Sequence, residues 1–448
     1  MKRRGLTGSK ATNHPAHGAG EFQKETRHNC VEYTETDINH LVEEAIEEID
    51  PIIRENKKIA RRNFRKVMQA FHENGVAESD FSGTTGYGYD DVGRDKLEEI
   101  YRMVFRSEDA LVRSQIISGT HAISLVLLAL LEAGDELIYI SGEPYDTLAK
   151  VIGSSDKDIG SLREKGVHYR SIDLVDDRFD ETAVMEAITE RTKMIAIQRS
   201  RGYSMRKSLT ISEMEVMIQR IKAEYPDIIV FVDNCYGEFV ETREPIEAGA
   251  DVIAGSLIKN PGGGLAKMGG YIAGNEDLVT RISYRLTVPG IGKEMGASLN
   301  ANTDMYQGFF MAPHAVVESL NGAVLTSHLL SKAGLKTDPA PDAERTDLIQ
   351  SVSFNTEAEM ITFTQMIQKA SPVNSRFLPV PSDIPGYEDP VIMAAGTFVQ
   401  GASLELSADG PVRAPYTVFV QGGLVFEHVV HALEMALLEM REKGMIML

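Results

Sequence analysis

Short apolar runs that alternate with helical stretches constrain the fold of this chain more than any other feature of its sequence. Between residues 115 and 274 the runs read QIIS, ELIYIS, VHYRSIDLV, TKMIAIQ, DIIVFVD, DVIAGSLI and GGYIAG, and helical patterns such as ISEMEVMIQRIKAEY separate several of them. This alternation is typical of a mostly parallel sheet that helices cover on both faces. We therefore predict an α/β fold for this part of the chain.

The rest of the chain divides around this central region. Residues 1–30 are polar, and we predict a disordered tail there. Residues 31–80 carry a helical pattern that Pro51 interrupts, which predicts two amphipathic helices. The polar run LKTDPAPDAERTD precedes a change in composition, after which the short strands SVSF, VIMAAGTF, ASLELS and TVFVQGG are expected. We predict a large domain at 81–320 and a smaller C-terminal α+β domain at 321–448.

Charge and composition argue against several classes of protein. The chain of 448 residues has a formal net charge of −20, which argues against a surface for nucleic acid or for an anionic membrane. The longest apolar stretch, Ala122–Leu131, is too short to span a bilayer. Only two cysteines occur, so we expect no disulfide framework and a reducing compartment. These features predict a cytoplasmic enzyme that acts on a small molecule.

Asp233 and Lys259 carry the main chemical signal. Asp233 ends the run IIVFVD, and Lys259 ends DVIAGSLIK, 26 residues later and just before PGGG. Because ligands of parallel sheets bind at the carboxyl ends of the strands, we expect both side chains at one sheet edge. Pyridoxal phosphate (PLP) chemistry needs a lysine for the Schiff base and an acidic group facing the pyridinium nitrogen. The pair predicts a PLP enzyme, although a surface lysine and a helix-capping aspartate are the plain alternatives.

A nucleophilic lysine also needs a suitable pKa. We expect partial burial and a nearby cation to lower the pKa of Lys259, so that its amine can react at neutral pH.

A phosphate site is predicted where a strand leads into a helix. Ser118, Gly119, Thr120 and His121 join the run QII to a strongly helical stretch. A helix start offers free N–H groups and a positive dipole end, and Thr120 could both cap the helix and donate its hydroxyl. Ser256 precedes Lys259 by three residues and could also bind the phosphate. The alternative for the first segment is an ordinary turn with a threonine cap.

Two further side chains are candidates for the site. Tyr145 follows Pro144 just after ELIYIS, where its ring could stack on a planar cofactor and its hydroxyl could pass a proton. Its alternative is an aromatic residue that covers the sheet edge. Arg413, in GPVRAPYTVFVQGG, could grip a substrate carboxylate, with a purely structural role equally open. Arg199 and Arg201 follow another strand and have no assigned role.

Other patterns do not support a nucleotide or metal site. The run PGGGLAK lacks the GK[ST] ending of a P-loop, and the glycines at 290–296 lack the spacing of a dinucleotide loop. His428 and His431 lie on a predicted helix without an HExxH pattern or a neighbouring cysteine. We predict no metal site.

The motifs SGTHA, PYDTL, FVDNCYGEF and GSLIKNPGGG, in this order, resemble those of fold-type-I PLP enzymes. Within that class they are similar to the cysteine/methionine-metabolism branch, which includes methionine γ-lyase and the cystathionine lyases. The stretch GYGYDDVGRDKLEEIY is similar to the divergent group called aluminium-resistance or methionine γ-lyase-like proteins. The resemblance covers roughly residues 35–445. It implies the PLP-dependent transferase fold, with a seven-stranded sheet in the large domain, and PLP as the cofactor.

The resemblance also implies roles for particular residues. Lys259 would form the Schiff base, Asp233 would face the ring nitrogen, and Tyr145 would stack on the ring. Near the phosphate it places Gly119, Thr120 and Ser256, and near the substrate carboxylate Arg413. Tyr87 or Tyr89 matches an aromatic residue that reaches the phosphate from the neighbouring subunit, but Asp91 stands where the related enzymes have an arginine. The implied assembly is a homodimer with shared sites, commonly paired into a tetramer.

We therefore predict a PLP-dependent carbon–sulfur lyase that eliminates at the β or γ carbon of a sulfur-containing amino acid such as methionine, cystathionine or cysteine. One alternative keeps the cofactor and changes the reaction to that of an aminotransferase or another amino-acid lyase. A non-catalytic PLP-binding protein is a further alternative. It is disfavoured because Lys259 and Arg413 are both present and because a basic patch is lacking.

Overall fold

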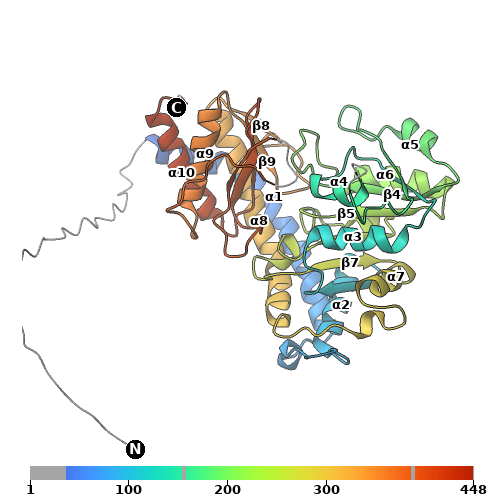
Figure 1. Cartoon of the computed structure of the whole chain (residues 1–448). Coiled ribbons are helices and arrows are strands. Elements are labelled where there is room, and N and C mark those ends of the chain that lie inside the picture. The colour runs from blue at the N-terminus through green and yellow to red at the C-terminus, as the bar shows by residue number, and fades with distance from the viewer. Residues whose placement is uncertain (1–36, 154–157, 385–388, 447–448) are drawn as a thin grey trace, which may run out of the picture.

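The computed structural model describes residues 37–153, 158–384 and 389–446, which form two lobes (Figure 1). The predicted tail at 1–30 lies outside the described residues. The large lobe contains a seven-stranded sheet, and the small lobe contains a five-stranded sheet. In Figure 1 the small lobe is drawn in orange and red, apart from the start of α1.

The large sheet has the strand order β1-β7-β6-β5-β4-β2-β3. Strands β6, β5, β4, β2 and β3 run parallel, whereas β7 is antiparallel to both of its neighbours. The predicted mostly parallel sheet is therefore confirmed. The strands are β1 (Asp109–Arg113), β2 (Glu136–Tyr139), β3 (His168–Ser171), β4 (Thr192–Gln198), β5 (Ile229–Asp233), β6 (Val252–Ser256) and β7 (Gly270–Gly274).

Helices cover both faces of this sheet because the middle positions of its central strands are apolar, and successive side chains point to opposite faces. Val230 and Val232 of β5 pack with α2 (Val92–Phe105) and α6 (Ile211–Glu224). Phe231, between them, packs on the other face. There the core includes α3 (Gly119–Leu130) and α7 (Glu276–Leu286). Each such side chain contributes about 1.5–3 kcal/mol when it is fully buried. The shorter helices are α4 (Asp146–Ile152), α5 (Glu181–Ala187), η1 (Glu78–Phe81), η2 (Pro245–Ala248), η3 (Asn260–Gly262) and η4 (Gly292–Glu294).

The N-terminal region forms one long helix, α1 (Asp37–Glu73), where the sequence predicted two. Pro51 lies inside it and is exposed, as is Glu47, whose carbonyl loses the usual helical partner. Water can reach that carbonyl, so the proline does not end the helix. The helix ends at Glu73, two residues before Gly75, whose φ of +54° suits the turn after a helix C-terminus.

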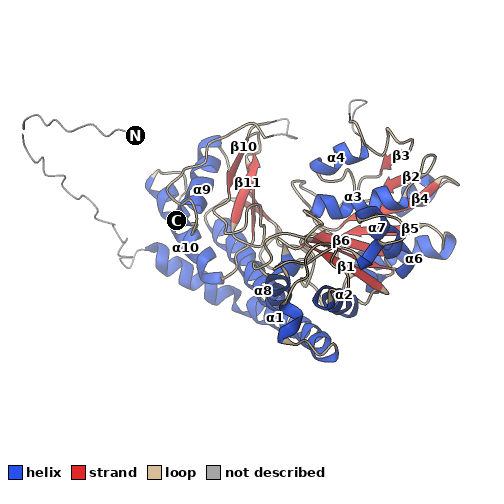
Figure 2. Ribbon diagram, turned by 60° about the horizontal axis from the view of Figure 1, so that its bottom comes forward, coloured by secondary structure: helices blue, strands red, loops and turns tan. Residues whose placement is uncertain are grey.

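Helices α1 and α8 (Asn302–Lys332) run along both lobes, side by side (Figure 2). The early part of α8, around Phe309, belongs to the core of the large lobe, and the later part, around Leu325, belongs to that of the small lobe. Helix α1 is divided in the same way, with Ile49 in the small core and Val67 in the large core. The predicted boundary between 320 and 321 therefore falls inside α8, between two cores that share a helix.

The small lobe has the antiparallel strand order β10-β11-β12-β9-β8, packed against α9 (Glu357–Ala370) and α10 (Phe426–Glu442). The predicted strand ASLELS is wrong, because this run is a buried loop and β11 begins only at Ser407. The alternation of apolar and polar residues in ASLELS does not indicate a strand here, because all six residues are buried. Glu405 accepts hydrogen bonds from the backbone of Phe398 and Val399 instead of pointing to solvent. The strands are β8 (Lys336–Asp338), β9 (Gln350–Ser353), β10 (Val391–Ala394), β11 (Ser407–Pro411) and β12 (Thr417–Gln421).

No helix in the described part of the chain is both long and apolar enough to cross a membrane. The same residues hold no cluster of three or more histidine, cysteine, aspartate or glutamate side chains suited to a metal ion.

Candidate active site

A cavity of about 250 Å³, called here the inner cavity, opens at the carboxyl ends of β4, β5 and β6, where the small lobe faces the large one. In the sheet register, Gln198 at the end of β4 lies beside Asp233 at the end of β5. The small lobe contributes Ile349, Phe419 and Gln421 to the wall. The predicted site residues that line this cavity are Ser118, Gly119, Thr120, Tyr145, Asp233, Ser256 and Lys259.

The N-terminus of α3 forms one wall of the inner cavity. Ser118 caps the helix by accepting a hydrogen bond from the backbone of His121 at 3.1 Å, so the predicted cap at Thr120 is wrong. A β-carbon on Gly119 would lie only 3.2 Å from Ser256 Cβ and 3.3 Å from Cys235 Sγ, so glycine lets α3 approach the sheet end closely. The Ser256 hydroxyl is buried there without a hydrogen-bond partner in the described chain. Free N–H groups, a helix dipole and an unpaired hydroxyl together suit a phosphate.

His121 does not line this cavity. Its Nδ1 accepts a hydrogen bond from the backbone of Ile117 at 3.2 Å, and burial lowers the pKa of its ring. The structure therefore does not bring the His121 ring together with the other predicted phosphate residues. The strand before α3 also ends earlier than predicted, at Arg113, so that QII lies in a turn.

Asp233 and Lys259 meet in the inner cavity as predicted. Asp233 is buried and accepts a hydrogen bond from the backbone of Cys235 at 3.1 Å. Burial raises the pKa of Asp233, and the positive charge of Lys259 opposes that change. Lys259 Nζ lies 4.0 Å from the ring centroid of Tyr236. The turn after Lys259 needs glycine, because a β-carbon on Gly263, where φ is +56°, would lie 2.1 Å from the Gly308 carbonyl oxygen on α8.

The expected lowering of the Lys259 pKa is wrong for the cofactor-free chain. Burial does lower the pKa of this amine, but nearby acidic groups raise it more, and the net direction is upward. Among these acidic groups Cys235 and Tyr236 contribute most, followed by Asp233 and Glu238. The described residues that shift this pKa most include no cation.

Glu238 is a buried acid that sequence reasoning missed. It is fully buried, its Oε1 accepts a hydrogen bond from the Tyr271 hydroxyl at 2.9 Å, and burial raises its pKa to about 8. Asn234 joins the same cluster by donating to Glu244 at 3.0 Å and to Tyr271 at 3.2 Å. The run CYGEF gave no sign of this burial, since an acid at that place in a loop usually faces water.

Tyr145 lies where the inner cavity meets a second, outer cavity of about 810 Å³. Its backbone N–H donates to Gln198 Oε1 at 2.8 Å, which fixes the start of α4 beside β4. Arg413 lines only the outer cavity, is exposed, and forms an ion pair with Asp389 at 2.8 Å. The structure therefore does not bring Arg413 together with Lys259 in the inner cavity.

Arg199 and Arg201 hold the two lobes together. Arg199 is fully buried and donates to Asn234 at 2.8 Å and to Thr346 at 3.1 Å. Arg201 donates to the Asp338 backbone carbonyl at 2.9 Å and pairs with the Asp338 carboxylate. These contacts give a structural role to two arginines that the sequence left without one.

Tyr87 and Tyr89 lie outside both cavities, on the loop before α2. Their rings stack with centroids 5.7 Å apart, and the side chains are 68% and 49% exposed. The backbone of Gly296 donates to the Tyr87 carbonyl at 2.9 Å and so fixes this loop. A contact between either ring and a phosphate would require a second copy of the chain, and it stays a prediction.

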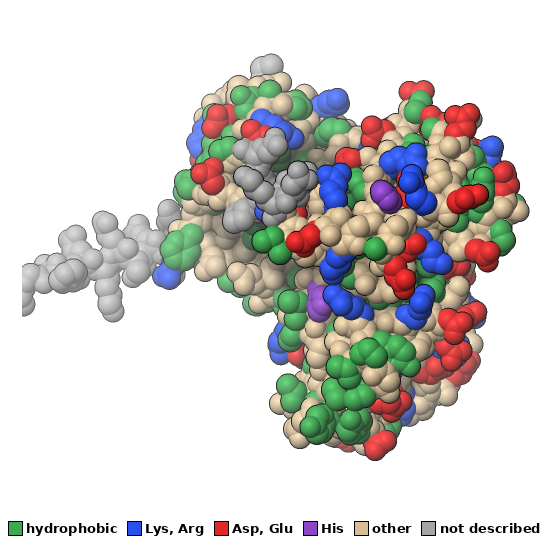
Figure 3. Space-filling view, turned by 45° about the vertical axis from the view of Figure 1, so that its right-hand side comes forward, with side chains coloured by type: hydrophobic (Ala, Val, Ile, Leu, Met, Phe, Trp, Pro, Cys, Tyr) green, Lys and Arg blue, Asp and Glu red, His purple; other side chains and the backbone are tan. Residues whose placement is uncertain are grey.

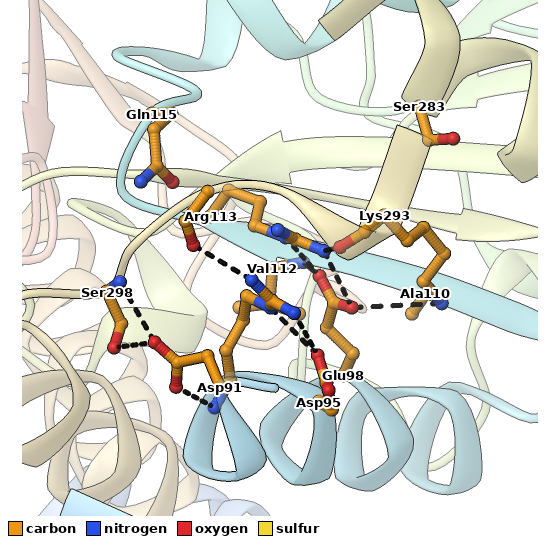
Figure 4. A network of polar contacts seen from close by, with 12 residues as sticks. Asp91, Asp95, Glu98, Ala110, Val112, Arg113, Gln115, Ser283, Lys293 and Ser298 are labelled. Carbon is orange, nitrogen blue, oxygen red and sulfur yellow. Dashed lines mark hydrogen bonds and ion pairs between the residues drawn. The ribbon is translucent and has the colours of Figure 1, made fainter. Parts of the chain in front are cut away.

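Asp91, which stands in place of the expected arginine, clamps this loop from within (Figure 4). It caps α2 by accepting from the Arg94 backbone at 3.0 Å, and it accepts from the Ser298 backbone at 3.1 Å and hydroxyl at 2.5 Å. Burial raises the pKa of Asp91, but these hydrogen bonds lower it more, and the pKa lies well below its usual value. Arg94 is buried as well and donates to the Gly88 carbonyl at 2.6 Å. Neither side chain is placed to bind a phosphate.

The chain is similar to known proteins along most of its length. The sequence model of the methionine gamma-lyase family matches residues 38–441. A solved structure from Listeria monocytogenes str. 4B F2365, provisionally named a cystathionine beta-lyase involved in aluminium resistance, is 54% identical, with a TM-score of 0.88. The match covers 89% of this chain and 99% of the other.

Two further solved structures extend this comparison. The carbon-sulfur lyase involved in aluminium resistance from Clostridium novyi NT is 43% identical, with a TM-score of 0.87, and the match covers 90% of this chain and 96% of that one. The PLP-dependent protein YhfS from Escherichia coli is 17% identical, with a TM-score of 0.58, over 86% of this chain and 97% of that one. This last likeness concerns the fold alone.

Proposed function

This chain belongs to the methionine gamma-lyase family, and we propose that it is a PLP-dependent lyase that breaks a carbon–sulfur bond in a sulfur-containing amino acid. The observation that carries the proposal is the inner cavity. It brings a half-buried lysine and a buried aspartate together, beside a helix N-terminus and a serine hydroxyl that has no hydrogen-bond partner in the described chain. The names of the related structures from Listeria and Clostridium support the same reaction.

The residues present fit PLP. The Lys259 amine would bind the aldehyde, and Asp233 would face the ring nitrogen. The first turn of α3 and the Ser256 hydroxyl would hold the phosphate, and Tyr145 is placed to cover the ring at the mouth of the cavity. When bound, the coenzyme supplies an electron sink for the substrate carbanion.

The chain itself would position the substrate and move protons. Lys259 Nζ would take the proton from the substrate α-carbon, a step for which a positioned base typically contributes about 10²–10⁴-fold. The acidic groups around Lys259, including Asp233, raise the pKa of its amine and so favour holding the proton once it has been taken. The buried setting excludes water and strengthens these interactions.

The substrate and reaction type can be tested together. Purified protein loaded with PLP should release a keto acid and ammonia from L-methionine, L-cystathionine or L-cysteine when no amino acceptor is added. An aminotransferase would instead need an acceptor keto acid, and a non-catalytic PLP-binding protein would turn over none of these substrates. Lys259→Ala should abolish release, because no other lysine lines the inner cavity in the described chain.

We also propose that two copies form a dimer with shared sites. Hydrophobic side chains gather at the end of the molecule that holds the loop before α2 (Figure 3). On this loop and at the start of α2 the exposed hydrophobic residues are Tyr87, Tyr89 and Val92, and Leu299, which precedes α8, is exposed as well. A stacked, exposed aromatic pair on a loop at the end of the molecule where hydrophobic side chains gather supports a protein interface. Pairing of dimers into a tetramer and a cytoplasmic location stay predictions.

A further inference from the structure

Tyr203 lies between the two cavities and links the two lobes. It lies on the loop between β4 and α6 and lines both the inner and the outer cavity. Its ring centroid is 5.8 Å from that of Tyr145 in the large lobe and 5.3 Å from that of Phe419 on β12 of the small lobe. Its hydroxyl donates a hydrogen bond to Asp409 Oδ2 on β11. Tyr203 thus presents one edge to the substrate side and the other to a buried acid.

Asp409 is a buried acid without a charged neighbour. It is 3% exposed, and in the sheet it lies between Met393 of β10 and Phe419 of β12. Its Oδ1 accepts a hydrogen bond from Gln421 Nε2 at 3.1 Å, and no cation in the described chain pairs with it. Burial raises the pKa of Asp409 to about 7, and the bond from Gln421 opposes that change. The carboxyl therefore takes up and releases a proton near neutral pH.

The direction of the bond between these two residues depends on that proton. When Asp409 is ionised, its oxygens can only accept, and the Tyr203 O–H must point at it. When Asp409 is protonated at Oδ2, it can donate to the Tyr203 oxygen instead. In that state the Tyr203 O–H no longer has to point at Asp409 and can donate to another acceptor.

We propose that Tyr203 is the general acid that protonates the departing sulfur, and that Asp409 resupplies its proton. This rests on the proposed lyase function. As the carbon–sulfur bond breaks, its electron pair leaves with the sulfur, which takes the proton of the Tyr203 hydroxyl. Asp409 passes its carboxyl proton to the Tyr203 oxygen, and Gln421 stabilises the carboxylate that remains. After the thiol departs, water in the outer cavity returns one proton through Tyr203.

The acid behind the tyrosine makes this transfer favourable. Proton transfer from a tyrosine with a pKa of about 10 to a thiolate, whose conjugate acid has a pKa of about 8.5, has an equilibrium constant that is unfavourable by roughly thirtyfold. When the proton comes instead from a carboxyl with a pKa of about 7, the equilibrium constant for protonating the thiolate is favourable by roughly thirtyfold. Lys259, the one cation lining the inner cavity in the described chain, is needed for the α-proton. The sequence had suggested Tyr145 for the leaving thiol, and the structure places a titratable carboxyl behind Tyr203.

Two substrates that differ in their leaving group test this proposal. S-methyl-L-cysteine loses a thiolate that needs a proton, whereas β-chloro-L-alanine loses chloride, which needs none. Tyr203→Phe and Asp409→Asn should lower kcat for S-methyl-L-cysteine by about 10²-fold. Both variants should keep kcat for β-chloro-L-alanine within about threefold of the original protein, which also shows that they fold and bind the cofactor. Asp50→Asn, which removes an exposed carboxylate paired with Arg54 on α1, serves as the matched control.

The outcomes separate this proposal from the proposed lyase function. Equal losses on both substrates, or no loss on either, would overturn the roles of Tyr203 and Asp409 while leaving the lyase intact. Failure of the original protein to release a keto acid from these two substrates and from L-methionine, L-cystathionine and L-cysteine would overturn both proposals.

A second readout needs no cofactor. A carboxyl whose pKa is raised by folding stabilises the protein at low pH, and this stabilisation is lost as pH rises toward its folded pKa. The unfolding midpoint of the cofactor-free protein should therefore fall, relative to that of Asp409→Asn, as pH rises from about 5 to 7. Parallel curves for the two proteins would contradict the proposal. In the described chain the other titratable group that contacts Asp409 is the Tyr203 phenol.

Discussion

The hydroxyl of Ser256 is buried in the wall of the inner cavity without a hydrogen-bond partner in the described chain, at a cost of about 1–3 kcal/mol. If a phosphate oxygen is its natural partner, Ser256→Ala should act in opposite directions on two quantities. The cofactor-free protein should gain about 1 kcal/mol in free energy of unfolding, and its affinity for PLP should fall about tenfold. Denaturant unfolding and a PLP binding titration measure the two effects.

Ser319→Ala is the matched control for this prediction. The Ser319 hydroxyl is also buried, but it donates to the Ala315 carbonyl at 2.9 Å, inside α8. This variant should lose stability and leave PLP affinity unchanged. A Ser256→Ala protein that behaved in the same way would show that Ser256 has a structural role only.

At the residue scale, sequence reasoning found the site residues that end a strand or begin a helix. Asp233 ends β5 and Ser118 caps α3, and strand ends and helix starts can be recognised from periodicity. Lys259 was predicted to end a strand, but β6 ends three residues earlier, at Ser256, and Lys259 lies in the turn before η3. Tyr203 and Gln421 were missed, since one lies in a loop and the other comes from the small lobe. The wrong direction for the pKa of Lys259 has a similar cause, because the sequence does not show that acidic groups other than Asp233 surround the amine.

The two long helices determine how the lobes behave together. Phe309 and Leu325 are both fully buried on α8, the first in the core of the large lobe and the second in that of the small lobe. Leu325→Ala should lower the free energy of unfolding by about 2–5 kcal/mol and Phe309→Ala by about 3–5 kcal/mol. Because α8 is continuous, each change should shift one cooperative transition of the whole protein. Calorimetry that resolved two transitions, with only one of them displaced in each variant, would contradict this account.

At the element scale, the fold class was predictable and several element boundaries were not. Apolar runs identified β4, β5, β6 and β7, because burial on both faces leaves no other pattern. Pro51 was read as a break between helices, but its position on the exposed side of α1 lets the helix continue. The run ASLELS shows that an alternating pattern can record burial without a strand. Here Glu405 binds the backbone of the neighbouring loop.

The proposed dimer concerns the whole molecule and can be tested at the loop before α2. A double change of Tyr87 and Tyr89 to alanine should weaken self-association at least tenfold, since buried aromatic residues carry much of the energy of an interface. It should also weaken retention of PLP, if one of these rings reaches the partner's phosphate. Sedimentation at several concentrations, with and without PLP, measures both effects.

Phe377→Ala is the control for the dimer prediction, because Phe377 is a similarly exposed aromatic residue but lies on the small lobe, away from the loop that carries Tyr87 and Tyr89. It should change neither association nor PLP retention. A double variant that stayed dimeric would place the interface elsewhere. If the variant also retained PLP normally, neither tyrosine would contact the phosphate of the partner's site.

The whole account depends on a covalent link between Lys259 and the cofactor. The direct measurement is borohydride reduction of the PLP-loaded protein, followed by digestion and mass spectrometry of the labelled peptide. We predict a single pyridoxyl label on Lys259, and no label in Lys259→Ala treated in the same way. A label on another lysine, or a protein that takes up no label, would contradict the assignment of the inner cavity as a PLP site.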